Sequence, residues 1–226
     1  MSRSYGIVSN SSGPVSVMTL LEELVAREYL ERNGFFLKLL YPEIAVQSKK
    51  TKAKGGGAHP TYLIQRQTGR SQNEPLGDRF QLFSSDLGGL AMAILVAFGW
   101  STPGLSQQVF QSGARYRSWV RNQVVPSFQS SLQGVGKQEN SPSSPAKMVL
   151  LPGLPVSEPY RQECIDLLKD SGVEAMFSIR TLLESLVGQI PLSPGIATST
   201  LSEMIRLLKV YELIRPPQMD LFDDDF

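Results

Sequence analysis

The 226-residue sequence predicts an α/β fold in which a mixed central sheet is flanked by helices. Stretches with helical periodicity alternate along the chain with short apolar runs that are typical of strands. A strand-helix-strand pattern at residues 147–179 has the length of a parallel crossover. Several helical stretches begin at Ser or Thr and are followed by Gly or Pro, which are common helix boundaries.

The N-terminal half predicts one long helix followed by strands. The helix covers residues 15–34, where Thr19 and Glu22 have capping-box spacing and Gly34 is a natural stop. Its expected core face is apolar: Val17, Leu20, Leu21, Leu24, Val25 and Leu30. Strands are expected at 35–41, 61–67, 79–84 and 94–100, with a helix cap at Ser85 or Asp86. A helix at about 106–124 follows, with Val109, Tyr116 and Val120 pointing inward.

The C-terminal half has clearer boundaries. A strand at 147–153, a helix at 157–172 and a strand at 173–179 are expected, with Ser157 as the N-cap and Gly172 as the stop. Two further helices are expected to start at Thr181 and Thr200, each with Glu three residues later. The last helix has a predicted core face: Leu201, Met204, Ile205, Leu208 and Tyr211.

These elements predict a domain organisation with one main core. Residues 1–14 are expected to be a flexible N-terminus, and residues 15–128 an α/β core. Residues 129–146, rich in Ser, Gly and Pro, are a linker or surface loop. Residues 147–214 add the strand-helix-strand unit and the C-terminal helices to the same core, and residues 215–226 are a disordered tail.

Cysteine usage and hydropathy favour a cytoplasmic protein without a membrane partner. Cys164 is the single cysteine, which excludes an internal disulfide and favours a reducing compartment. Its place on an apolar helix face predicts a packed thiol rather than a nucleophile. The longest apolar run, residues 87–100, is too short to span a bilayer, and the N-terminus lacks the apolar run of a signal peptide.

Residue types that carry catalysis or bind cofactors are scarce, so no cofactor is predicted. His59 is the single histidine and has no acidic neighbour in the sequence. No Cys/His cluster with zinc-ligand spacing is present. The glycines at 55–57 are not followed by the Gly-Lys-Ser/Thr ending of a phosphate-binding loop.

Residues 15–152 nevertheless resemble the PD-(D/E)XK nuclease superfamily, in a long first helix, several strands, a strand ending in "VAFGW", then a helix and a strand. The resemblance implies a restriction-endonuclease-like fold, in which an acid and a lysine on that strand serve a divalent metal. Val96 stands at the acid position and Phe98 at the lysine position, so the expectation is a nuclease-like scaffold without catalysis and without a metal. Two alternatives stay open: an unrelated α/β domain, and a nuclease with relocated acids at Glu74, Asp78 and Asp86.

Charge is unevenly distributed along the chain, and this favours DNA as a further partner. Residues 1–147 carry 16 Lys or Arg against 9 Asp or Glu, whereas residues 148–226 carry 6 against 12. Four lysines gather in the glycine-rich stretch 48–60 and are candidate phosphate contacts: Lys49, Lys50, Lys52 and Lys54. The alternative is a solvated loop.

The tail carries the most specific motif of the chain, "QMDLF" at residues 218–222. It resembles the pentapeptide by which bacterial replication and repair proteins dock on the sliding clamp. The resemblance implies a partner-binding site made of Gln218, Met219, Asp220, Leu221 and Phe222. The leading prediction is a non-catalytic accessory protein of bacterial DNA replication or repair. The alternatives are the relocated nuclease and a structural subunit whose tail packs within an oligomer.

Overall fold

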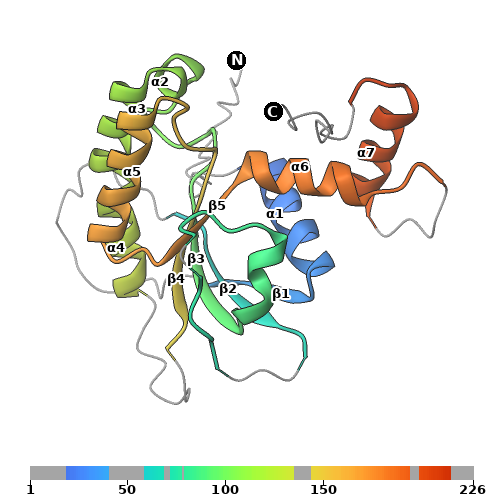
Figure 1. The fold of residues 1–226 in the computed structure, drawn as a ribbon, viewed down its shortest axis with the longest axis horizontal. Coiled ribbons are helices and arrows are strands. Elements are labelled where there is room, and N and C mark those ends of the chain that lie inside the picture. Colours follow the sequence, from blue (N-terminus) through green and yellow to red (C-terminus); the bar gives the residue numbers. More distant parts are fainter. Residues whose placement is uncertain are drawn as a thin grey trace, which may run out of the picture.

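Five strands form one mixed sheet in the order β1-β2-β3-β4-β5 (Figure 1). In this computed structural model the described residues are 19–40, 59–68, 72–77, 79–134, 144–193 and 199–214. The strands are β1 (Phe35–Leu40), β2 (Thr61–Arg66), β3 (Met92–Ala97), β4 (Ala146–Leu151) and β5 (Ala175–Ser178). β2 is antiparallel to β1 and β3, whereas β3, β4 and β5 are mutually parallel. The mixed sheet flanked by helices that the sequence predicts is therefore confirmed.

Helices cover both faces of the sheet and make a three-layer arrangement (Figure 1). On one face lie α1 (Leu20–Arg32) and α6 (Ile179–Gln189), followed by α7 (Thr200–Val210). The other face is covered by a run of helices and by α5 (Glu158–Asp170). This run comprises α2 (Gln107–Gln111), α3 (Gly113–Trp119), the π-helical segment η2 (Val120–Val124) and α4 (Val125–Gly134). A short 3-10 helix, η1 (Ser84–Gly89), precedes β3.

β3 lies in the middle of the sheet and contributes to both hydrophobic cores. Leu95 and Ala97 belong to the cluster beneath α1 and α6. Val96 and Phe98 point the other way, into the cluster beneath α3, η2 and α5. Because side chains alternate along a strand, a continuous apolar run of this kind is what a strand buried on both faces requires.

The strand-helix-strand unit is present as the sequence predicts. β4 and β5 are parallel and α5 connects them. Ser157 is the residue before α5, although its side chain makes no capping hydrogen bond, and Pro159 lies in the first turn. Gly172 has φ of +90°, a left-handed conformation that glycine adopts without the steric penalty of a side chain. Cys164 is fully buried on α5, and burial raises the pKa of its thiol to about 12, with a smaller contribution from Glu163.

The expected core face of α1 was wrong at its N-terminal end. The capping box of Thr19 and Glu22 is confirmed, and Val25 and Leu30 are buried. Leu20 and Leu21, however, are 74% and 54% exposed. Glu22 occupies the inward position of the first turn, because its carboxylate accepts hydrogen bonds from Thr19 at the helix start and from the backbone N–H of Trp100 after β3.

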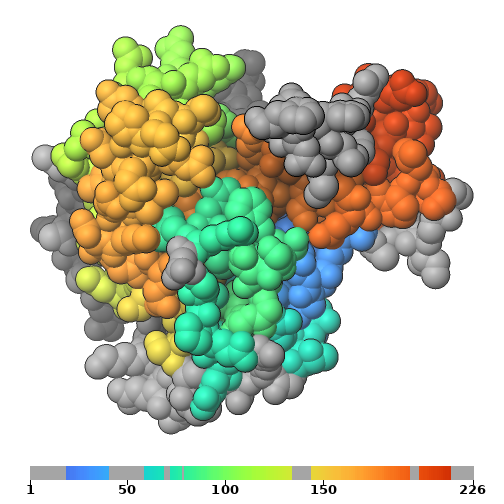
Figure 2. All heavy atoms as spheres, in the orientation of Figure 1, coloured from blue at the N-terminus to red at the C-terminus, as the bar shows by residue number. Residues whose placement is uncertain are grey.

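The expected core face of α7 was also wrong in part. Leu201 and Ile205 are buried, but Met204 and Tyr211 are 51% and 72% exposed. α7 projects from the body of the molecule beyond α6 and contacts the rest through one side (Figures 1 and 2). A narrow contact of this kind cannot cover a wide apolar stripe.

Several element boundaries differ from the predictions. The strand expected at residues 79–84 is reduced to a single β-bridge between Gln81 and Met176. The helix expected at 106–124 is interrupted at Ser112 and runs on through α4 to Gly134, into the expected linker; Tyr116 and Val120 are buried, as predicted. α6 starts at Ile179, before the predicted Thr181, because Ser178 accepts the N-terminal hydrogen bond. α7 starts at Thr200, as predicted, and Ser199 caps it. Within the described residues, every helix is too short or too polar to cross a bilayer.

Candidate functional site

Val96 and Phe98, the two positions on which the nuclease resemblance depends, carry apolar side chains at the carboxyl end of β3. Thr61 of β2 is the register partner of Val96 in β3. Val96 and Phe98 are both fully buried and pack in the cluster beneath α3, η2 and α5. Neither side chain carries an atom that binds a cation or transfers a proton, so these positions support packing.

His59 lies beside these positions, just before β2. Its side chain is 8% exposed, and its ring centroid lies 4.4 Å from that of Phe98. Burial lowers the pKa of the imidazole to about 4, outweighing a hydrogen bond with the backbone of Ala97 that acts in the opposite direction. Nδ1 has no hydrogen-bond partner among the described residues. His59 is thus a neutral, packed histidine, and no acidic residue lies next to it in the sequence.

Glu22 is a buried carboxylate at the carboxyl end of β3 that the sequence analysis assigned to capping alone. Its Oε1 accepts a 2.7 Å hydrogen bond from the backbone N–H of Trp100. Its Oε2 accepts from the N–H and the hydroxyl of Thr19, at 2.8 and 2.9 Å. Gly99 leaves room for this carboxylate, because a Cβ there would lie 2.1 Å from Oε2. Both oxygens of Glu22 are therefore committed to joining α1 to β3.

Two of the acids proposed as relocated ligands, Asp86 and Glu74, lie at opposite ends of η1. Asp86 accepts a hydrogen bond from the N–H of Phe83, and so stabilises the start of η1. Glu74 lies against Gly89 at the other end of η1. Asp78 lies outside the described residues. Among those that are described, no group of three or more His, Cys, Asp or Glu side chains could hold a metal ion.

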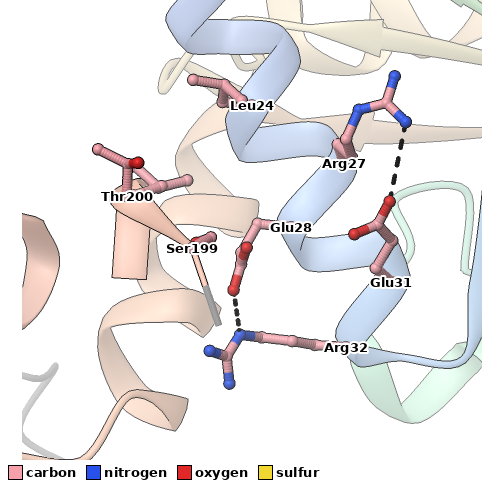
Figure 3. A pocket seen from close by; sticks show the side chains of 8 residues that line it. Leu24, Arg27, Glu28, Glu31, Arg32, Ser199 and Thr200 are labelled. Atoms are coloured by element: carbon pink, nitrogen blue, oxygen red, sulfur yellow. Dashed lines mark hydrogen bonds and ion pairs between the residues drawn. The ribbon is translucent and has the colours of Figure 1, made fainter. Parts of the chain in front are cut away.

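A hollow of about 530 Å³ lies between α1 and the start of α7 (Figure 3). Arg27 and Arg32 line it together with acidic residues of the same helix. Nε of Arg32 donates to Glu28 over 2.7 Å, and Arg27 pairs with Glu31 at 3.7 Å. Its charges are thus compensated within α1, which favours a structural role in holding α7.

The hydrogen bonds of this hollow reach across to α7. The hydroxyl of Ser202 donates to Oε1 of Glu28 over 2.7 Å and accepts from Nη2 of Arg32 at 2.8 Å. Burial by itself would raise the pKa of Glu28, but hydrogen bonds from Ser199, Ser202 and Arg32 outweigh it and hold the pKa below its usual value. A carboxylate that stays charged keeps this network intact.

Both binding sites predicted from the sequence lie outside the described residues. These are the lysines Lys49, Lys50, Lys52 and Lys54, and the pentapeptide Gln218–Phe222. The last described residue, Ile214, packs against the core cluster beneath α1 and α6. The pentapeptide starts four residues farther along the chain.

Comparisons of the chain with protein-family models, with curated proteins and with solved structures find no match.

Proposed function

We propose that this protein is a non-catalytic accessory factor of bacterial DNA replication or repair that docks on the sliding clamp through Gln218–Phe222. One observation carries the proposal: all five residues fit the clamp-binding pattern of Gln, an aliphatic residue, Ser or Asp, Leu and Phe. Pro216 and Pro217 stand between α7 and this peptide, and proline disfavours continuation of a helix. An extended peptide with a few apolar anchors is a common form of recognition by a groove.

The chemistry of the pentapeptide fits such a groove. Burial of the Leu221 and Phe222 side chains contributes about 1.5–3 kcal/mol each. Gln218 adds amide donors and an acceptor, which fix the register of the peptide. Ordering the peptide opposes binding by about 1–2 kcal/mol per residue. The expected affinity is therefore modest, on the order of micromolar.

The non-catalytic part of the proposal is supported by the packing of β3. The element order of α1, three antiparallel strands, a helical run and a parallel strand agrees with the PD-(D/E)XK resemblance. By that resemblance Val96 and Phe98 correspond to the acid and the lysine of the family, and both side chains are fully buried. Restoring charge at these buried positions would destabilise the domain, since an unpaired buried ion costs several kcal/mol. The sheet then serves as a scaffold that carries the docking peptide.

Fluorescence polarisation with a bacterial sliding clamp tests the docking. A labelled peptide covering residues 214–226 should bind with a dissociation constant on the order of micromolar. The full chain should compete with it. The double change Leu221→Ala and Phe222→Ala should weaken binding more than about 100-fold, because about 3 kcal/mol or more of apolar burial is lost.

A matched control changes two residues outside the pentapeptide. Asp224→Ala with Asp225→Ala removes charge but leaves Leu221 and Phe222 in place, so binding should change by less than about fivefold at 0.15 M salt. Equal binding by the leucine-phenylalanine variant and the natural sequence would rule out clamp docking by this motif. Cleavage of plasmid DNA by the purified chain with Mg²⁺ or Mn²⁺ would contradict the non-catalytic assignment.

A further inference from the structure

The helical run α2–α4 belongs to a long stretch of sequence without acidic residues. From Leu87 to Gln138 there is no Asp or Glu, whereas Arg115, Arg117 and Arg121 are basic. The other exposed residues of the run are uncharged and are mainly Gln, Ser and Asn. Because α2–α4 carry no acidic side chains, these helices do not repel an approaching polyanion.

Two of these arginines are not neutralised. Arg117 pairs with Glu163 of α5 at 2.8 Å. Arg115 and Arg121, both exposed, form no ion pair with any residue that the structure describes. Most other arginines of the described residues have a carboxylate within ion-pair distance, as Arg27, Arg79 and Arg180 do. The α3–η2 surface therefore presents two guanidinium groups that are available to an external anion.

A hollow lies beside Arg115 on this surface. It measures about 470 Å³ and is lined by residues of α3 and η2 together with Gly104 and Val109. Arg115 is the one charged residue in its lining, and Ser118, Asn122 and Gln123 supply hydroxyl and amide groups. The π-helical turn η2 contributes the two amides, and the N–H of Val125 bonds to the carbonyl of Val120 across it. Turns of this kind occur frequently at functional sites.

We propose that the α3–η2 surface, defined by Arg115, Ser118, Arg121, Asn122 and Gln123, binds the phosphate backbone of duplex DNA. Guanidinium, hydroxyl and amide groups are the side chains that most often contact phosphate oxygens, and such contacts position a protein without reading sequence. The inference rests on the proposed function for its setting, because a clamp-bound factor lies next to duplex DNA. It assigns that contact to a folded surface that the sequence analysis did not identify.

Anisotropy of a labelled random-sequence 25-base-pair DNA duplex, titrated with the full chain in the absence of any clamp, tests the inference. For Arg115→Gln with Arg121→Gln, we expect the slope of log K against log salt to become shallower by about 1.8, since each phosphate contact contributes about 0.9. The dissociation constant at 0.1 M salt should rise by more than about tenfold. Ser118→Glu, which keeps both arginines but adds a carboxylate to the hollow, should also weaken binding.

A control of equal charge separates a local contact from a general effect. Arg79→Gln with Arg180→Gln removes the same charge from side chains of which 68% and 76% are exposed, on other surfaces. This variant should shift the salt slope by less than about 0.5. Equal losses in the two double variants, or no binding of duplex DNA by the natural chain, would overturn the proposal. Because this assay contains no clamp, such a result would not bear on clamp docking, which the peptide assay tests separately.

Discussion

Two buried side chains, Glu22 and His59, lie close to the carboxyl end of β3. Glu22 accepts hydrogen bonds from Thr19 and Trp100. His59 packs on the ring of Phe98, and its imidazole stays neutral. Buried charges are tolerated when hydrogen-bonded, and an imidazole without a counter-ion loses its proton instead. Both residues therefore stabilise the fold at this edge.

His59 gives the first prediction. Its pKa is lowered from 6.5 to about 4 in the folded protein, mainly by burial. As pH falls through 6.5 the unfolded chain takes up a proton that the folded chain does not, so stability should fall between about pH 6.5 and 4. NMR titration can follow this directly, since the chain has one histidine.

The control for this titration is His59→Phe, which keeps an aromatic ring beside Phe98 and removes the titrating group. Denaturant unfolding of this variant should depend less steeply on pH between 6.5 and 4 than unfolding of the natural chain. A histidine signal that titrates near pH 6.5 would show that the imidazole is solvated and would contradict the packing described above.

At the scale of elements, α7 is the helix that is held least broadly. It meets α1 and α6 along one side and leaves Met204, Leu207 and Val210 about half exposed. Its polar attachments are the network of Ser202 with Glu28 and Arg32, and the hydrogen bonds that the Lys209 ammonium donates to carbonyls at the end of α6. Elements with few buried contacts open locally before the whole domain unfolds. We therefore expect α7 to be separable from the sheet in its stability.

The change Ser202→Ala tests this separation. It removes one hydrogen bond from each charged partner, which should cost about 1–3 kcal/mol. Hydrogen exchange of amides in α7 should accelerate by about tenfold or more, while exchange in β3 and β4 stays unchanged. Ser130→Ala is a suitable control, because its hydroxyl bonds within its own helix to the carbonyl of Pro126. Uniform acceleration across the sheet would show that α7 is an integral part of the core.

At the scale of the whole molecule, both described core clusters are built from residues that precede the pentapeptide. The buried residues of both core clusters lie between Val25 and Ile205, and Ile214 packs at their margin. The proposed partner contacts lie in different places: the α3–η2 surface on one layer, and a peptide that follows α7 of the opposite layer. Two weak contacts on one chain raise the overall affinity by effective concentration.

Removal of residues 216–226 should therefore abolish clamp binding and leave the fold intact. The thermal unfolding midpoint of the shortened chain should stay within about 2 °C of the full chain, since a shift of 1 kcal/mol moves it by about 2–4 °C at this size. Scanning calorimetry beside the polarisation assay measures both effects. A midpoint lowered by more than about 5 °C would indicate that Leu221 and Phe222 pack on the domain, and would contradict a tail that is free to dock.

Local sequence patterns predicted where the helices and strands of this protein lie better than they predicted which helix faces are buried. The apolar run at β3 and the crossover of β4, α5 and β5 follow from periodicity and boundary residues, because these depend on neighbours in the chain. Leu20 and Met204 were assigned to the core by the same periodicity and are exposed. Helical spacing shows that a face is apolar, but not whether another element covers it.

The sequence by itself determined the mixed α/β architecture, the apolar character of Val96 and Phe98, and the presence of the pentapeptide "QMDLF". Each of these features depends on residues that are close together in the sequence. The tertiary structure alone decided that Glu22 binds the end of β3, that Ser202 binds Glu28, and that Arg115 lies unpaired beside a hollow. Ion pairing and burial depend on residues far apart in the chain, and the fold determines which of them meet.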